Sequence, residues 1–200
     1  MDTGLTLKTK RLLLREFEEA DRESVHVYAS DPEVVRYLPC GPNMEEDTKG
    51  FVRHAISYQE EMPRLHFELA AVLKADGSLI GGCGLHVTSP ENREGVIGYC
   101  FNSLYWHAGF ATDATEALTV FGFEQVRLHR IWAGCDPENL ASARVLEKVG
   151  MKREARLREN LWMRGRWRDS LIYSILDKEW QELRERTSSK DRETQAAGVA

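Results

Sequence analysis

The chain has 200 residues, a length that fits one domain with a sizeable core. Its 27 basic and 32 acidic residues give a net charge of −5, which argues against a general nucleic-acid-binding protein, and the mixture of signs argues against a disordered chain. No apolar run approaches membrane-spanning length and the first residues carry no apolar signal core, so we expect a cytoplasmic protein without a membrane partner. Four cysteines show no metal-ligand spacing and are expected to be buried, reduced thiols: Cys40, Cys83, Cys100 and Cys135.

The first third of the chain predicts one strand and three helices. Residues Lys10–Phe17 have a β-prone core, and Asp21 opens an amphipathic helix. Asp31 and Pro32 fit the cap and the first position of a second helix, because Asp accepts hydrogen bonds from free N–H groups and Pro lacks a donor that would be unsatisfied there. A third helix is predicted over Glu45–Glu61. Its predicted core stripe is formed by Phe51, Ala55 and Tyr58.

Beyond Pro63 the hydrophobic period changes to two. The alternation predicts a β-hairpin with strands over Leu65–Ala71 and Leu79–Val87, joined by a turn at Gly77. A further strand is predicted over Gly95–Asn102, followed by a helix from Thr112 to about Gln125.

The remaining pattern completes an α/β protein. A strand over Arg130–Cys135 leads into a helix that Gly150 terminates. Two strands, Lys152–Trp162 and Arg168–Leu176, flank a turn around Gly165. The order of elements predicts a sandwich around a mixed sheet, in which a helical connection forces one parallel strand pair.

The domain boundaries follow from the same pattern. Residues 1–186 are predicted to form a single domain. Residues 187–200 have no hydrophobic periodicity and are expected to be a disordered tail.

A segment of small residues lies between the strand that ends at Asn102 and the helix that begins near Thr112. It reads Trp-His-Ala-Gly-Phe-Ala-Thr, starting at Trp106. Gly109 lets the backbone adopt a positive φ or approach a ligand closely, and the N–H groups that begin the following helix attract anions. The segment therefore predicts an anion site, most naturally for phosphate.

A second segment makes this interpretation more specific. Starting at Asp136, it reads Asp-Pro-Glu-Asn-Leu-Ala-Ser-Ala-Arg-Val-Leu-Glu-Lys-Val-Gly-Met and follows another predicted strand. Together the two segments resemble the GNAT superfamily of N-acetyltransferases, in particular the branch that contains the ribosomal-protein N-terminal acetyltransferases. The resemblance extends from about Leu7 to Leu176. One departure is Trp106, which stands where the family's phosphate motif has Arg or Gln.

The resemblance implies a GNAT-like mixed β-sheet flanked by helices, with a splayed central parallel strand pair, and acetyl-CoA as co-substrate without a metal. A backbone N–H near Phe101 would hold the thioester oxygen. Asn139 matches a residue that meets the cofactor arm, and its alternative role is to cap the following helix. The residues implied in acetyl-CoA binding are Tyr99, Cys100, Phe101, Trp106, His107, Ala108, Gly109, Phe110, Ala111, Thr112, Asn139 and Ser142.

Two catalytic residues common in GNAT enzymes have no counterpart here. The helix Tyr that protonates the thiolate is replaced by Leu146, and the strand Glu that serves as base is replaced by Val96. Ser142 matches a Ser that points at the sulfur in the ribosomal-protein branch, with a first-turn capping role as the alternative. Glu159 is the first candidate for a base and Glu68 the second, and either could instead be an ordinary exposed strand residue. The histidines and cysteines show no metal-binding pattern.

The sequence thus predicts an N-acetyltransferase that transfers acetyl from acetyl-CoA to a primary amine by direct attack in a ternary complex. A protein or peptide N-terminal amine is the favoured acceptor, because an α-amine has a pKa near 8 and is partly neutral at pH 7. A small-molecule amine such as an antibiotic, a polyamine or an amino acid is the enzymatic alternative. A non-catalytic acyl-CoA-binding module is the non-enzymatic one. The sequence leaves the oligomeric state open, with a homodimer as one option.

Overall fold

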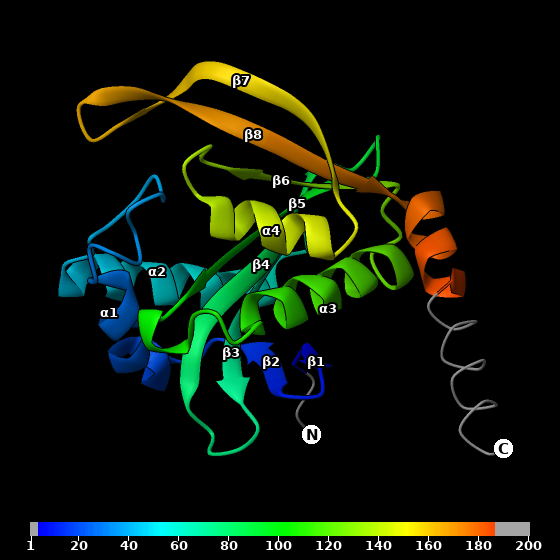
Figure 1. Ribbon diagram of the computed structural model, residues 1–200. Helices are drawn as coiled ribbons and strands as arrows, with labels where there is room; N and C mark the ends of the chain where they lie inside the picture. The colour runs from blue at the N-terminus through cyan, green and yellow to red at the C-terminus, as the bar shows by residue number, and fades with distance from the viewer. Residues whose placement is uncertain (1–3, 187–200) are drawn as a thin grey trace, which may run out of the picture.

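The computed structural model describes residues 4–186 as one eight-stranded mixed sheet with helices on both faces (Figure 1). The strands lie in the order β1-β2-β3-β4-β5-β6-β8-β7. Their bounds are β1 (Thr6–Lys8), β2 (Leu12–Glu16), β3 (His66–Leu73), β4 (Leu79–Ser89), β5 (Glu94–Phe101), β6 (Arg130–Cys135), β7 (Lys152–Met163) and β8 (Arg166–Leu176). The helices are α1 (Arg22–Ala29), α2 (Glu45–Ser57), α3 (Phe110–Glu124) and α4 (Leu140–Lys148), with short 3-10 segments η1 (Glu19–Asp21), η2 (Tyr58–Glu60) and η3 (Ser103–Tyr105). Residues 177–186 are also helical.

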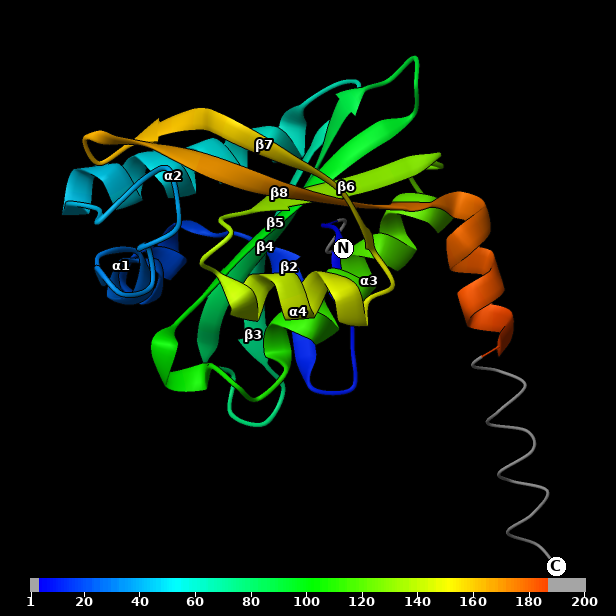
Figure 2. The ribbon, with the colours of Figure 1, turned by 45° about the horizontal axis from the view of Figure 1, so that its top comes forward.

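The sheet separates two hydrophobic layers. On one face α3 and α4 cover a large core that includes Leu85, Leu118 and Leu146. On the other face α1 and α2 cover a smaller core built on Phe17 and Val52 (Figures 1 and 2). Central strands supply both layers, because successive side chains of a strand point to opposite faces. The predicted α/β sandwich around a mixed sheet is confirmed.

The strands β5 and β6 form the parallel pair that the sequence predicts. Their pairing runs from Glu94 opposite Arg130 to Val96 opposite Trp132 and ends there. Both strands continue beyond these residues, so they splay apart toward their carboxyl ends. Ligands of open α/β sheets bind at this end of the strands.

The last two strands form a long hairpin that projects beyond the rest of the sheet (Figure 1). β8 pairs with β6, and β7 is an edge strand whose side chains are mostly exposed. At the turn, Arg164 donates hydrogen bonds to five backbone carbonyl groups of the segment between α1 and α2. These carbonyls belong to Val35, Arg36, Leu38, Cys40 and Gly41. The turn of the hairpin is thereby tied to the side of the sheet that α1 and α2 cover.

The prediction of a helix that begins at Asp31 and Pro32 is wrong. Residues 32–37 form successive turns, and Asp31 Oδ1 accepts a hydrogen bond from the N–H of Glu33 at 2.9 Å. A helix here would need an N–H group four residues after Val35, where Pro39 has none. The guanidinium of Arg164 donates to the Val35 carbonyl instead, at 2.8 Å.

The helix predicted over Glu45–Glu61 is shorter than expected, and only part of its predicted core stripe is buried: Ala55 is buried as predicted, whereas Tyr58 is half-buried. α2 ends at Ser57, and η2 continues the chain as a 3-10 turn. Phe51, assigned to the core stripe, is 37% exposed. The buried residues of α2 are Thr48, Val52 and Ala55.

The ends of the described chain and the burial of the cysteines also bear on the sequence predictions. The hydrophobic pattern does not predict β1 or the helix of residues 177–186. The tail predicted for residues 187–200 lies outside the described part of the chain. All four cysteines are free; Cys83 and Cys135 are buried, and Cys40 is exposed, contrary to the expectation of burial.

Candidate active site

The predicted phosphate loop lies between β5 and α3. Gly109 is the N-cap of α3 and has a φ of +83°, in the left-handed region where glycine is favoured. Its carbonyl accepts the first helical hydrogen bond from the N–H of Asp113 at 3.1 Å. The N–H groups of the first turn have no partner within the helix and carry the positive end of its dipole. The loop therefore offers N–H donors to an anion, and its binding of a phosphate or pyrophosphate group stays a prediction.

Arg11, near the start of the chain, contacts this loop and holds it in place. Its Nε donates to Asp113 Oδ2 at 2.8 Å, and its Nη1 donates to the carbonyl of Ala108 at 2.6 Å. The guanidinium also lies 4.5 Å from the centre of the Phe110 ring. Sequence reasoning missed Arg11, because a contact between residues 97 positions apart leaves no local pattern.

Trp106, which replaces the Arg or Gln of the family motif, has a structural contact of its own. Its indole Nε1 donates to the carbonyl of Phe101 at 2.8 Å. The bond closes the short η3 connection and fixes the end of β5 relative to the loop. His107, also in the loop, is exposed and has a φ of +60°.

The backbone of β5 presents two N–H groups toward the gap between β5 and β6. The N–H of Asn102 donates to the carbonyl of Ile80 in β4 at 2.9 Å. Successive residues of a strand alternate the edge to which they direct their N–H groups. Phe101, and likewise Tyr99, therefore directs its N–H away from β4 and toward β6. The gap opens beside these two residues because the β5–β6 register has already ended at Val96.

Cys100 is oriented differently from its neighbours. It pairs with Gly82 in the β4 ladder, and its side chain packs against the core under α1 and α2. Burial raises the pKa of its thiol to about 12. Of the three predicted residues on this strand, Tyr99 and Phe101 are the two whose N–H groups face the gap.

The start of α4 lies against Tyr99. The Tyr99 hydroxyl and Ser142 Oγ are hydrogen-bonded at 2.8 Å. Asn139 is the N-cap of α4, and its Oδ1 accepts a hydrogen bond from the N–H of Ser142 at 3.1 Å. Burial raises the pKa of Tyr99 to about 12, so the phenol stays protonated and can donate. The structure thus pairs Ser142 with the side-chain hydroxyl of Tyr99. The sequence predicted a role only for the backbone of Tyr99.

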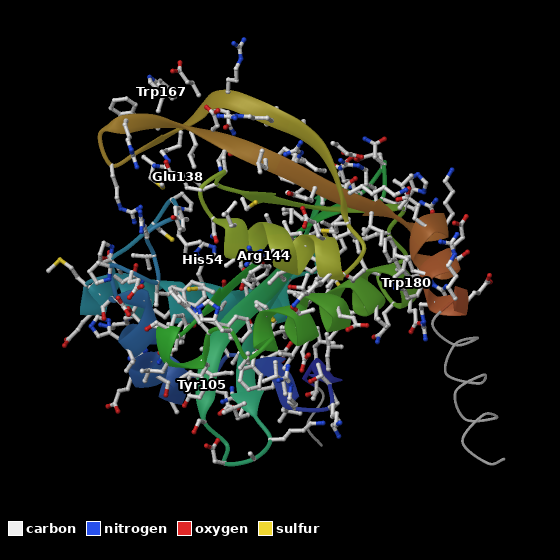
Figure 3. The ribbon with its side chains drawn as sticks, in the orientation of Figure 1. His54, Tyr105, Glu138, Arg144, Trp167 and Trp180 are labelled. Carbon is white, nitrogen blue, oxygen red and sulfur yellow. The ribbon has the colours of Figure 1, made fainter. Side chains whose placement is uncertain are left out.

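A buried ion pair anchors this end of α4 to the hairpin. Arg168 Nε donates to Asp136 Oδ2 at 2.7 Å, and its Nη2 lies 3.1 Å from Glu138 Oε2. The side chains of Arg168 and Asp136 are 7% and 5% exposed. Figure 3 shows Glu138 beneath the hairpin, beside the start of α4. The pair therefore fixes the segment from which Asn139 and Ser142 project.

The structure does not bring Glu159 to this group. It lies on the edge strand β7 at an irregularity of the β7–β8 register, with a φ of +50° and an exposed side chain. Its N–H donates to Asp169 Oδ1 at 2.9 Å. Trp162 and Trp167 form an exposed edge-to-face pair near the hairpin turn, with ring centres 5.2 Å apart. Figure 3 shows Trp167 at this end of the hairpin.

The described residues 4–186 contain no group of three or more side chains suited to a metal ion. Within the same range, every helix is too short or too polar to cross a membrane. Leu146, at the position of the usual Tyr, is fully buried in the core.

Residues 11–152 match the model of the acetyltransferase (GNAT) domain family. The chain is 38% identical over 175 residues to the uncharacterized N-acetyltransferase YnaD of Bacillus subtilis (strain 168), covering 87% of this chain and 98% of that protein. Its fold is similar to that of an acetyltransferase (GNAT family) from Bacillus anthracis, with a TM-score of 0.78 and 37% identity over 87% of this chain and 99% of that one. Mycobacterium smegmatis RimJ, in complex with CoA-disulfide, is similar with a TM-score of 0.76 and 26% identity over 89% of this chain and 88% of that one.

The chain therefore belongs to the GNAT family and is an acetyl-CoA-dependent N-acetyltransferase. The site fits the co-substrate in two respects. The left-handed Gly109 has no Cβ where the helix N-terminus would meet a pyrophosphate, and the two N–H groups of β5 face the gap that a pantetheine arm would enter.

Proposed function

We propose that this acetyltransferase transfers acetyl directly to the α-amine of a protein or peptide N-terminus, in a ternary complex with acetyl-CoA. The observation that carries this choice of acceptor is the charge of the β7–β8 hairpin. Between Lys152 and Arg168 the hairpin has seven basic and two acidic residues, in a chain whose net charge is −5. Its turn lies on the α1/α2 side of the sheet, opposite the helices that form the phosphate loop and carry Ser142.

The backbone of β5 would stabilise the charge that develops during transfer. When the amine attacks, the thioester oxygen becomes an oxyanion, and the N–H of Phe101 faces the gap where this oxygen would lie. A fixed backbone donor of this kind contributes roughly 3 kcal/mol to lowering the barrier. The donor is a backbone group, and the Trp106 indole, which donates to the Phe101 carbonyl, helps to fix its position.

Ser142 and Tyr99 would act on the leaving group. Their hydroxyls form one hydrogen-bonded pair at 2.8 Å, so a proton given by Ser142 to the thiolate can be replaced from Tyr99, and the proton that the amine nitrogen sheds on forming the amide restores the phenol. The pair thus offers a donor although Leu146 stands where the usual Tyr would be. Asn139 would both cap α4 and orient Ser142 through the backbone bond at 3.1 Å.

The positive charge of the hairpin favours a peptide acceptor over a polyamine acceptor. A spermidine N(1)-acetyltransferase of Escherichia coli (strain K12) is 23% identical over 84% of this chain, and a ribosomal-protein-S5-alanine acetyltransferase from Vibrio fischeri is 22% identical over 88% of it. These similarities are nearly equal and do not decide between the acceptors. A surplus of arginine repels a polycation but tolerates the single charge of an N-terminal amine, so it favours a peptide.

The basicity of the two amines of a peptide favours the α-amine over the lysine side chain as the acceptor. An α-amine has a pKa near 8 and a lysine side chain a pKa near 10.4, so the neutral fraction of the α-amine is roughly a hundredfold larger at neutral pH. With Val96 in place of the usual strand Glu, the site favours the amine that loses its proton more easily.

Peptides that carry one free α-amine and one internal lysine test this proposal. Incubation with acetyl-CoA should modify the α-amine, as located by tandem mass spectrometry, and an equal concentration of spermidine should compete poorly. Reversing the hairpin charge with Arg158→Glu and Arg166→Glu should raise spermidine turnover relative to peptide turnover. Lys8→Glu, on β1 at the opposite edge of the sheet, is the matched control. Preferential acetylation of the lysine would refute the proposal, and rapid acetylation of spermidine without any peptide product would favour a small-molecule acceptor.

A further inference from the structure

The face of the sheet opposite α3 and α4 is uncovered where β5 and β6 separate. Gly84 of β4 pairs with Gly98 of β5, and alternation places Gly98 on the same face of the sheet as Cys100, the face that α1 and α2 cover elsewhere. Gly98 is exposed, and a Cβ built on it would meet no atom within 4 Å. Gly134 of β6 is also exposed. An exposed glycine in the middle of a sheet means that no helix covers this position. We call Gly84, Gly98 and Gly134 the glycine floor.

The glycine floor is where an acceptor can reach the thioester. The predicted phosphate loop, Tyr99 and Ser142 all lie with α3 and α4, so acetyl-CoA would occupy that face and the gap between β5 and β6. An attacking amine must approach the carbonyl carbon from outside the cofactor, and the floor provides the opening on the other side of the gap.

One carboxylate lies over this floor. Glu68 of β3 pairs with Gly84, and its side chain leans across that strand: a Cβ at Gly84 would lie 2.6 Å from Glu68 Oε1 and 2.8 Å from Oε2. Gly84 is itself paired with Gly98, so the carboxylate is about one strand spacing, ~5 Å, from the β5 backbone. The side chain of Glu68 is 19% exposed, so it is accessible yet held in place.

His86 holds this carboxylate. Its Nε2 and Glu68 Oε1 are 2.6 Å apart. The His86 ring is packed edge-on against His66, with ring centres 4.9 Å apart, and His66 stacks on Tyr58 at 4.5 Å. Glu61 in turn bonds His66 Nδ1 at 2.9 Å. The imidazole of His86 is therefore fixed on both sides and can donate to one oxygen of Glu68, which leaves the other oxygen for a substrate.

We propose that Glu68 is the proton acceptor for the incoming amine and that His86 positions its carboxylate. The step rests on the proposed transfer to an amine that enters over the glycine floor. One proton of the ammonium passes to Glu68 through water in the opening, because Gly98 and Phe101 lie three residues, ~10 Å, apart along β5, and the freed electron pair of the nitrogen attacks the thioester carbon. The C–N bond forms, the C–S bond breaks, and the second proton shed by nitrogen ends on the sulfur with the help of Ser142 and Tyr99. The proton on Glu68 then returns to solvent, so the net products are the amide, the free thiol of CoA and one proton.

The phenols that face Glu68 stay neutral in the range where the amine titrates. Burial raises the pKa of Tyr28 and of Tyr58 above the usual value, and Glu68 itself adds to both shifts. The buried thiol of Cys83 has a raised pKa for the same reasons. His54 and His66 are the remaining rings around the cluster, and both are present in every variant compared below.

The first experiment measures peptide acetylation by Glu68→Gln, which keeps the size of the side chain. At pH 7 we expect kcat to fall about 10²-fold or more with the KM for acetyl-CoA unchanged. The deficit should shrink as the pH rises to 9, because an α-amine then loses its proton to water. His86→Gln should cause a smaller loss. Asp177→Asn, just beyond the end of β8, removes a similar carboxylate–histidine contact, 3.2 Å from His129 Nδ1 and away from the floor, and is the matched control.

Two outcomes overturn the assignment. A Glu68→Gln variant that retains its kcat within twofold at pH 7, or whose deficit is the same at pH 7 and 9, would show that the carboxylate only supports the structure. If kcat falls in Glu159→Gln but not in Glu68→Gln, the base is Glu159 of the hairpin. If the wild-type enzyme prefers a lysine or a small amine, the proposed acceptor fails, but the same comparison on that amine still decides the role of Glu68.

A second variant tests the floor without touching the base. Gly98→Val adds a side chain into open space at a β-strand position, so the fold should tolerate it. We expect the KM for the amine to rise about tenfold or more while binding of acetyl-CoA, measured by calorimetry, stays the same. Unchanged amine kinetics would show that the acceptor does not use this opening.

Discussion

Replacing Gly109 by Ala tests the phosphate loop on which acetyl-CoA binding depends. Gly109 has a φ of +83°, and its Cβ would point to within 3.2 Å of Arg11 Nη2. The left-handed conformation costs an L-residue about 1–2 kcal/mol, which lowers the free energy of unfolding. If the phosphate-loop assignment is correct, the new methyl group would also stand between the backbone and the pyrophosphate. Loss of one charge-assisted hydrogen bond, at about 1.5–3 kcal/mol, would weaken acetyl-CoA binding by roughly 10- to 150-fold.

Gly77 provides a control with the same backbone strain. It has a φ of +77° in the turn between β3 and β4, and its Cβ would meet no atom within 4 Å. Gly77→Ala should therefore lower the melting temperature about as much as Gly109→Ala, yet leave acetyl-CoA affinity intact. Titration calorimetry on both folded variants makes the comparison. Equal affinities for acetyl-CoA would refute the phosphate-loop assignment, whatever the melting temperatures show.

Three further substitutions test the groups around the start of α4. Ser142→Ala should lower kcat about 10²-fold with little change in acetyl-CoA affinity, whereas an unchanged kcat with a lower melting temperature would assign Ser142 to capping alone. Because the folded pKa of Tyr99 is about 12 and its unfolded pKa about 10, this phenol stabilises the fold below pH 10 and the contribution is lost as the pH rises from 10 to 12. Tyr99→Phe should lose less stability than the wild type over that range in urea titrations, and parallel curves would contradict the shift. Arg168→Met leaves Asp136 buried without its partner and should cost about 3–5 kcal/mol of unfolding free energy, whereas a cost below about 1 kcal/mol would show that water reaches the carboxylate.

The parts of the molecule that the sequence predicts are those whose structural cause is local. The predicted phosphate loop is one contiguous segment, and glycine at position 109 permits the positive φ observed there. The β3–β4 hairpin follows from alternation on both sides of a turn, and the Asn139 cap follows from a side chain that bonds three residues ahead. In each case the interacting groups are close in the sequence, so composition and spacing are sufficient.

The parts that the sequence does not predict depend on distant partners. Arg11 reaches the loop across 97 positions, and Arg164 converts an expected helix near Asp31 into a series of turns by bonding carbonyls more than 120 positions away. Phe51 is exposed because the docking of α2, and not its own periodicity, decides which side is buried. The pairing of Tyr99 with Ser142 likewise arises only when β5 and α4 are packed together.

Acetyl-CoA and the amine would therefore be recognised by different kinds of protein group. Acetyl-CoA would meet mainly backbone donors, in the loop at Gly109 and on β5 at Phe101, and such donors persist through many side-chain changes. The amine would meet side chains on separate strands, with Glu68 from β3 and His86 from β4 meeting only because the strand register places them together. A single substitution on the amine side can thus alter the acceptor while acetyl-CoA binding remains. This difference explains why sequence motifs indicate the co-substrate of this enzyme. The acceptor depends instead on how side chains from separate strands are arranged on the face of the sheet opposite α3 and α4.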